Sequence, residues 1–314
     1  MSILVVGSRG SALALRQTRQ IVEEVERLNP GVTCRVEVIK TTGDKILDVP
    51  LAKIGDKGLF VKEIELALIE GKIDFAVHSA KDLPSEMDDR LVVTAFPERE
   101  CPADAFVSKV GALSELPKGA MIGTSSLRRR AQILAARPDV SVLDLRGNLD
   151  TRLRKLDDSE YDAIILACAG LYRMGLESRI TEMLPYEVCL PAAGQGALAV
   201  QCRKDDPACE IIGRLDHSLT RACVSAERAL LAGLGGGCQI PIAALAREEN
   251  GALKLDAAVA ALDGKRIERG SAVGDIAAGE ELGKRLAGEL LDSPARDLLE
   301  EIRRSDEPKS IGAA

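Results

Sequence analysis

Cys238 is the residue of this chain whose surroundings most directly indicate chemistry, because it follows three glycines in the segment GGGCQIP (residues 235–241). Glycines either leave room for a bulky group to approach the sulfur or allow the backbone to turn very tightly. A thiol that is accessible in this way could act as a nucleophile. A lone cysteine is more often a small buried apolar residue, so this stretch alone favours a structural role.

A cluster of basic side chains occupies residues 126–155. It contains eight Arg or Lys and three Asp, a local charge of +5 in a chain whose net charge is −7. Planar guanidinium groups bind carboxylates through paired hydrogen bonds, so a compact anionic ligand would explain the cluster. The plainer alternative is a solvated basic helix face.

Asp82 follows the apolar run 73–77 and lies in the segment HSAKDLP (residues 78–84). A carboxylate in such a position could hold a proton for a leaving group and stabilise positive charge beside it. The alternative is that Asp82 only caps a turn before Pro84. His78 ends the apolar run, and we interpret it as structural.

Composition narrows the class of protein. The 314 residues are 46% apolar and 29% charged, as expected for a folded chain of two or three domains. Eight scattered cysteines without a C-x-x-C pair, and only two histidines, argue against a zinc site and against disulfides. Negative net charge and the absence of Trp argue against nucleic acid as the main partner. Met1 runs directly into a strand-like segment and no apolar run approaches ~18 residues, so we expect a cytoplasmic protein without a membrane span.

The elements that position these groups repeat along the chain. A β-α-β-α-β pattern begins at residue 3 and a second one near residue 120, which indicates two α/β lobes with mainly parallel sheets. Ser11 is the expected N-cap of the first helix, and the long segment 41–58 is interpreted as containing a mobile lid at 43–57. The expected strands are 3–6, 34–40, 73–77, 140–145, 161–166 and 197–200, of which the last returns to the first lobe. Residues 121–126 repeat the strand, glycine and hydroxyl-rich turn of residues 5–9. The expected helices end near residues 28, 70 and 137.

Two connections between the lobes predict a cleft with a hinge. Ligands of such sheets bind at the carboxyl ends of the strands, where the turns beginning at Gly7, His78 and Gly123 fall. After residue 218, two hairpin signals (Asn250-Gly251 and Asp263-Gly264) predict a small α+β domain with an antiparallel three-stranded sheet. The predicted boundaries are 1–96 and 197–215 for the first lobe, 102–190 for the second, 97–101 and 191–196 for the hinge crossings, and 218–314 for the C-terminal domain.

Arg9 and five sequence blocks together resemble the porphobilinogen deaminases, also called hydroxymethylbilane synthases. They follow in the family's order over residues 3–245, so a chance match is excluded. The blocks are HSAKDLP (78–84), GTSSLRRRAQ (123–132), LRGNLDTRLRKL (145–156), PAAGQGALA (191–199) and GGGCQIP (235–241).

The resemblance implies a fold and a reaction. The fold has three domains, of which two resemble the lobes of periplasmic solute-binding proteins. The reaction joins four molecules of porphobilinogen head to tail, with loss of ammonia, to give the hydroxymethylbilane used for tetrapyrroles. A dipyrromethane cofactor, bound through a thioether to Cys238, is implied as well, together with a monomer and no metal. The thiolate would attack a carbon once and remain bonded to it, which requires no neighbouring histidine. The glycines before Cys238 are then expected to make room for this two-ring group, with the turn as a secondary consequence.

The resemblance also assigns roles to individual residues. Asp82 is the expected catalytic acid, because ammonia must leave with a proton and the pyrrole left behind, an azafulvene, is positively charged. The residues expected to hold the cofactor, besides Cys238, are Ser79, Lys81, Thr124, Ser126, Arg128, Arg129 and Arg152. Those expected to receive the substrate are Arg9, Ser11, Phe60, Arg146, Arg173 and Gln195.

Two other functions remain open from the sequence. The lobes could form an anion sensor or carrier, which would bind reversibly without releasing ammonia. The chain could also be an inactive relative, although none of the named positions is substituted.

Overall fold

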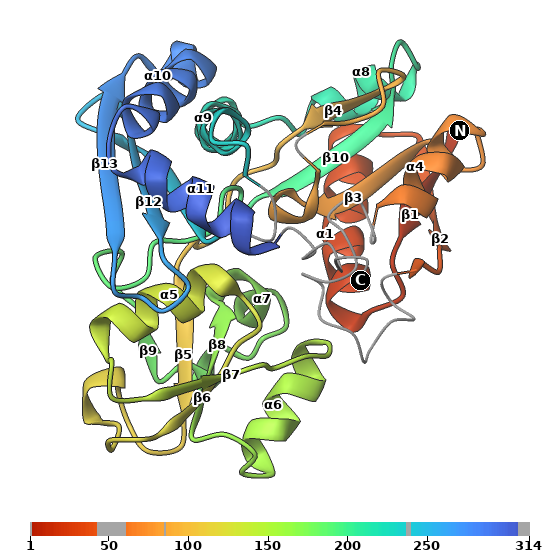
Figure 1. Cartoon of the computed structure of the whole chain (residues 1–314). Helices are drawn as coiled ribbons and strands as arrows, with labels where there is room; N and C mark the ends of the chain where they lie inside the picture. The colour runs from red at the N-terminus through yellow and green to blue at the C-terminus, as the bar shows by residue number, and fades with distance from the viewer. Residues whose placement is uncertain (1, 43–60, 85, 237–239, 307–314) are drawn as a thin grey trace, which may run out of the picture.

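The computed structural model describes residues 2–42, 61–84, 86–236 and 240–306, which form three separate β-sheets with helices packed on them (Figure 1). Two sheets have five strands and the third has three. The predicted class, two α/β lobes and a small domain with an antiparallel sheet, is therefore confirmed. The predicted lid, Phe60 and Cys238 lie outside the described residues.

The first sheet has the strand order β2-β1-β3-β10-β4. β1 is parallel to β2 and β3, whereas β10 is antiparallel to both of its neighbours. This confirms that the strand predicted at 197–200 returns to the first sheet. The sheet is nevertheless mixed, because a strand that enters from the other lobe is free of the helical crossover that keeps strands parallel. Its strands are β1 (Ser2–Ser8), β2 (Val32–Val38), β3 (Phe75–Ser79), β4 (Leu91–Ala95) and β10 (Leu198–Arg203).

Helices cover both faces of the first sheet because its strands are apolar on both sides. Leu4 and Val6 pack with Ile21 of α1 on one face, while Val5 packs with Ile64 of α4 on the other. This alternation follows from the two-residue period of a strand. The helices are α1 (Ala12–Leu28), α4 (Lys62–Ile69) and α8 (Ala208–Gly213).

The second sheet repeats this plan with the order β7-β6-β8-β5-β9. β6 is parallel to β7 and β8, and β5 is antiparallel to β8 and β9. Ile133 of α5 belongs to the core on one face, and Leu156 of α6 and Leu171 of α7 to the core on the other. The elements are β5 (Asp104–Ser108), β6 (Met121–Gly123), β7 (Ser141–Leu143), β8 (Ala163–Ala167), β9 (Glu182–Met183), α5 (Leu127–Ala136), α6 (Leu149–Asp157) and α7 (Cys168–Arg173), with 3-10 turns η2 (Leu113–Glu115) and η3 (Glu177–Arg179).

The third sheet is an antiparallel meander, β11-β12-β13. Asn250 and Gly251, with φ of 56° and 79°, form the predicted turn between β11 and β12. Three helices bury one face of the sheet, and the other face contacts Leu190 of the second lobe. The elements are β11 (Ile242–Glu249), β12 (Ala252–Ala260), β13 (Ile267–Gly274), α9 (Ser218–Gly233), α10 (Gly279–Leu291), α11 (Ala295–Asp306) and the 3-10 turn η4 (Ile276–Ala278).

The two chain segments between the lobes lie against each other. The Glu100 amide donates a hydrogen bond to the Gly196 carbonyl oxygen at 3.3 Å. Gly196 has a φ of +89°, and a side chain there would collide with the Glu100 carbonyl. Glycine is therefore required at this crossing for both conformation and space.

Candidate active site

A cavity of about 110 Å³ lies where the first lobe meets α7 of the second. Six of the residues that the sequence assigns to catalysis, cofactor or substrate line it, and they come from three separate stretches of the chain. They are Arg9, Ser11, Ser79, Lys81, Asp82 and Arg173.

The topology explains why these stretches meet. β1 and β3 are parallel neighbours, so the turns that follow them leave the same edge of the sheet. The turn after β1 carries Arg9, and the 3-10 turn η1 (Ala80–Asp82) follows β3. Ser11 caps α1 as predicted, since its Oγ accepts a hydrogen bond from the Ala14 amide at 3.3 Å. α7 approaches from the second lobe, and a side chain on its Gly170 would lie in van der Waals contact with Leu13 of α1.

Asp82 and Lys81 are adjacent at the cavity but differ in exposure. Asp82 is exposed, whereas Lys81 is half-buried and its Nζ donates to Oε1 of Gln195 at 3.4 Å. Burial and the charge of Arg129 lower the pKa of Lys81 to about 8, with Asp82 opposing them. Lys81 therefore loses its positive charge in mildly alkaline solution unless an anion binds beside it.

Asp104 is the buried carboxylate that pairs with the basic cluster, and no sequence pattern marked it as a candidate. We call it the anchor of the cluster. Its carboxylate is fully buried and accepts from Nη1 of Arg128 at 2.6 Å and from Nη2 of Arg129 at 2.7 Å. Nε2 of Gln195 donates to the same group at 2.8 Å. Burial alone would raise the pKa of Asp104, but the charges of Arg128 and Arg129 hold it well below its usual value. The carboxylate is thus ionised across the working pH range.

This anchor changes the interpretation of Arg128 and Gln195. Arg128 is 6% exposed and also donates to the Leu190 carbonyl oxygen at 2.7 Å, so its contacts are internal. Gln195 has no exposed surface, because its amide bridges Asp104, Lys81 and the Pro102 carbonyl oxygen. The predicted direct contact of Gln195 with substrate is therefore not supported by its placement; the residue positions its charged neighbours.

Arg152 and Arg129 belong to one electrostatic group. Nε of Arg152 donates to the Gly147 carbonyl oxygen at 2.8 Å. Burial and then the charge of Arg129 lower the pKa of Arg152 to about 10, while Asp82 opposes the shift and Arg146 adds to it. The structure therefore brings the basic cluster to Asp82, although the two are far apart in sequence.

The hydroxyl groups of Thr124 and Ser126 serve the backbone. Oγ of Ser126 accepts from the Arg129 amide at 3.4 Å and caps α5, and Oγ1 of Thr124 accepts from the Ser126 amide at 3.2 Å. Thr124 is buried. These side chains fix the start of the helix that carries Arg128 and Arg129.

Arg173, at the end of α7, connects the cavity to a hinge crossing. Its Nη2 donates to the Gly196 carbonyl oxygen at 2.7 Å, whereas its buried Nε has no hydrogen-bond partner. Burial lowers the pKa of Arg173 to about 10, opposed by Glu100. A buried donor without a partner in a cavity wall is suited to an anionic ligand.

His78 has the structural role that the sequence indicates. Its Nε2 lies 3.0 Å from Oε1 of Gln201, and the ring is buried in the first lobe. Burial lowers the pKa of His78 to about 4, against the effect of the Gln201 hydrogen bond. The imidazole is therefore neutral at physiological pH.

Two family models of known proteins match most of this chain. The model of the "Porphobilinogen deaminase, dipyromethane cofactor binding domain" matches residues 4–210, and that of the "Porphobilinogen deaminase, C-terminal domain" matches residues 221–292. The chain belongs to the porphobilinogen deaminase family. Two relatives named porphobilinogen deaminase are those of Desulforamulus reducens (51% identical over 307 residues, 96% of this chain and 99% of that protein) and Carboxydothermus hydrogenoformans (52% over 303 residues, 96% and 97%).

Solved structures with looser similarity include periplasmic binding proteins. A TRAP periplasmic solute binding protein from Desulfovibrio salexigens has a TM-score of 0.41 and 12% identity, covering 68% of this chain and 72% of its own. A periplasmic binding protein from Salmonella typhimurium has a TM-score of 0.37 and 12% identity, covering 68% and 92%.

The charges of the site fit the dipyrromethane cofactor of the porphobilinogen deaminase family. Such a group carries several carboxylates, and cations outnumber acids here. Lys81 and Arg129 both donate to Oε1 of Gln195, at 3.4 and 3.5 Å, so these two cations lie close enough to repel one another. The charge of Arg129 accordingly lowers the pKa of Lys81, and it also lowers that of Arg152. A bound polycarboxylate would relieve that repulsion.

Two of the glycines before Cys238, which are expected to make room for the cofactor, pack closely against other parts of the protein. A side chain on Gly235 would meet the Arg303 guanidinium, and one on Gly236 would meet Leu231 and Ile242. Gly235 also has a φ of +60°. At these two positions the turn after α9 and its neighbours account for glycine without a cofactor, so the expected role in making room stays a prediction. Gly237 lies outside the described residues.

Glu227 is a second buried acid that the sequence analysis missed. It has no exposed surface and accepts from Nη1 of Arg99 at 2.6 Å, from the Gly194 amide at 2.6 Å and from the Ala246 amide at 2.8 Å. These groups belong to the two hinge crossings and to β11. Glu227 therefore ties the C-terminal sheet to both crossings. Its only sequence signal is an acid on the apolar helix 218–233.

Within the described ranges, no group of three or more His, Cys, Asp or Glu could hold a metal ion. Over the same residues, no helix has the length and apolar character needed to cross a bilayer.

Proposed function

We propose that this chain is a transferase that joins four porphobilinogen molecules head to tail, releases ammonia at each addition and finally releases hydroxymethylbilane by hydrolysis. This places it in tetrapyrrole biosynthesis. The observation that carries the proposal is the single cavity that unites Asp82 with Lys81, Arg9 and Arg173, in a chain matched to the family along most of its length.

The dipyrromethane cofactor supplies the primer to which the substrate rings are added. We propose Cys238 as its point of attachment. Lys81, Ser79, Arg129 and Arg152 would hold its carboxylates. Thr124 and Ser126 would act mainly by fixing the start of α5, and Arg128 by its internal ion pair with Asp104.

Asp82 is proposed as the proton-holding group. Its exposed carboxylate at the cavity can hold a proton at Oδ for the leaving amine, and then face the positive charge that develops on the substrate pyrrole. The neighbouring cations bind the substrate's acetate and propionate and orient the ring. Arg9 and Arg173 line the cavity with Ser11, and Arg146 lies close enough to influence Arg152.

The attachment is tested by the intact mass of the purified protein. Wild type should exceed its sequence mass by one dipyrromethane and give a coloured product with Ehrlich's reagent. Cys238→Ser should have the bare mass and no colour, whereas Cys34→Ser, an exchange in β2 on the first lobe, should retain both. A bare wild-type mass would contradict the proposal.

The role of Asp82 is tested by Asp82→Asn. The variant should fold, retain the cofactor and lose nearly all release of ammonia, because the amide cannot supply a proton. Asp89→Asn is the matched control, since Asp89 is also exposed and does not line the cavity. Near-normal turnover of Asp82→Asn would show that another group is the acid.

We further propose that the protein acts as a monomer in the cytoplasm, as the family resemblance implies. Sedimentation at micromolar concentration should give one species at the mass of a single chain, 33.5 kDa plus the cofactor.

A further inference from the structure

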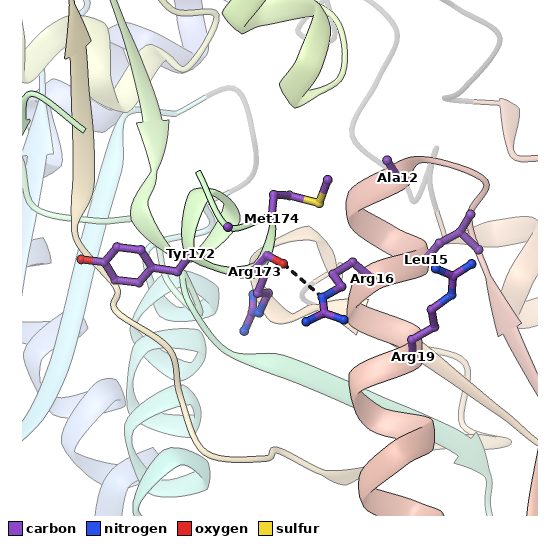
Figure 2. A pocket seen from close by; sticks show the side chains of 8 residues that line it. Ala12, Leu15, Arg16, Arg19, Tyr172, Arg173 and Met174 are labelled. Carbon is purple, nitrogen blue, oxygen red and sulfur yellow. Dashed lines mark hydrogen bonds between the residues drawn. The ribbon is translucent and has the colours of Figure 1, made fainter. Parts of the chain in front are cut away.

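A second and larger cavity lies between α1 and the end of α7 (Figure 2). Its volume is about 540 Å³. The residues of α1 that line it are Ala12, Leu15, Arg16 and Arg19, and those at the end of α7 are Tyr172, Arg173, Met174 and Gly175. Arg173 is the residue that lines both cavities.

The lining carries three guanidinium groups and no acid. Arg16 and Arg19 are three residues apart on α1, so they lie on one face of the helix. Nε of Arg16 donates to the Arg173 carbonyl oxygen at 3.2 Å (Figure 2). Arg19 has no ion-pair partner among the described residues, unlike Arg27, which pairs with Glu24 at 2.6 Å on the same helix.

The two cavities differ in volume, which suits them to ligands of different size. A space of about 110 Å³ is too small for a chain of several pyrrole rings, whereas sites for ligands of that size enclose roughly 300–1,000 Å³. Each added ring also brings two more carboxylates, which must leave the first cavity as the chain grows. The neighbouring space that shares Arg173 has both the volume and the positive charge to receive them.

We infer that the cavity between α1 and α7 is an accessory carboxylate site for the growing pyrrole chain, with Arg16 and Arg19 as its binding residues. The inference rests on the proposed function. The site is used only after the first rings have been added, because the first cavity and its cations receive the early substrates. Arg16 and Arg19 therefore act on late additions and leave early ones unchanged.

The double variant Arg16→Gln/Arg19→Gln tests this with intact-mass spectra after mixing with limiting porphobilinogen. Species with one or two added rings should form at the wild-type rate, and passage to three and four rings should slow on the order of tenfold, the effect of losing about one charge-assisted hydrogen bond. The matched control is Arg27→Gln/Arg35→Gln, which also removes two positive charges, from exposed ion pairs outside the cavity. The control should give the wild-type series.

Salt provides a second measurement. Raising sodium chloride from about 0.05 to about 0.5 M should slow the late additions more than the early ones in wild type and control, and this difference should disappear in Arg16→Gln/Arg19→Gln. Two results would overturn the inference and leave the proposed function intact. One is an unchanged series of masses in the folded variant, and the other is a block of the variant at the first addition. If wild type forms no ring adducts at all, the proposed function fails and the accessory site fails with it.

Discussion

Replacing Asp104 by asparagine should remove the negative charge that holds two buried guanidinium groups. The carboxylate has no exposed surface, and Arg128 and Arg129 are each 6% exposed at their side chains. Removing one partner of a buried ion pair costs about 3–5 kcal/mol, because the remaining charge is left uncompensated. Asparagine keeps the shape and one acceptor oxygen, so we expect about 3 kcal/mol, near the lower limit.

This loss is measured by urea unfolding and by thermal melting. The Tm of Asp104→Asn should fall by about 5 °C for a chain of this size. The variant should also retain less cofactor by intact mass, since Arg129 loses its anchor. Asp139→Asn is the control: Asp139 pairs with Arg137 at 2.8 Å but is 35% exposed at its side chain, so its loss should be much smaller.

The contribution of Asp104 to the free energy of unfolding should depend on pH in a defined direction. Because the folded-state pKa of Asp104 is depressed, its stabilisation is fully present above the unfolded value of about 4 and is lost as the pH falls below it. The stability difference between wild type and Asp104→Asn should therefore be constant from pH 8 to about 5 and narrow below about 4. A difference under about 1 kcal/mol at pH 7, or one that does not narrow in acid, would refute the reasoning.

Three further predictions concern the hinge and its neighbours. Glu227→Gln should lower stability by about 3 kcal/mol, since Arg99 is left buried and unpaired, and should speed amide hydrogen exchange at Gly194; unchanged exchange would argue against the tie between crossings. Cys101, whose pKa is lowered mainly by its interaction with Cys168, should be alkylated faster at neutral pH than Cys34, whose pKa burial raises to about 11, in the same peptide map; equal rates would contradict the lowered pKa. Gly194→Ala should cost about 1–2 kcal/mol and reduce turnover, because φ is +74° and the new methyl would lie 3.0 Å from the backbone of η1; full activity would show that this contact does not position Asp82.

Local sequence patterns determined most of the elements that the structure contains. Ser11 and the apolar period that follows predict α1 to Leu28, where it ends. Asn250-Gly251 predicts the hairpin between β11 and β12, because few residues other than Asn and Gly readily adopt two successive positive φ angles. Five of the six predicted site residues at the cavity meet for a similar reason, since they end or follow β1 and β3, whose carboxyl ends share an edge. The sixth, Arg173, arrives with α7 of the second lobe.

Pairings between distant side chains were not accessible in this way. Asp104 opens an ordinary apolar strand, and nothing in its neighbourhood marks it as the partner of Arg128 and Arg129. Burial and partner choice depend on how α5 packs on the second sheet, which no local period encodes. The same limit explains Gln195, whose block was recognised while its complete burial was not.

The contacts of Asp104 with Arg128 and Arg129 are compatible with a ligand-binding role for this cluster. One carboxylate neutralises only one of the two guanidinium groups, so their local charge remains positive. The shared anchor also fixes Arg129 before any ligand arrives: its Nη1 donates to the Ile165 carbonyl oxygen at 3.0 Å, and its Nη2 to Asp104. A cation held in this way loses little conformational entropy when it binds a carboxylate. We therefore expect the ion pair with Asp104 to prepare Arg129 for an anion, and Asp104 to support the site without contacting the ligand.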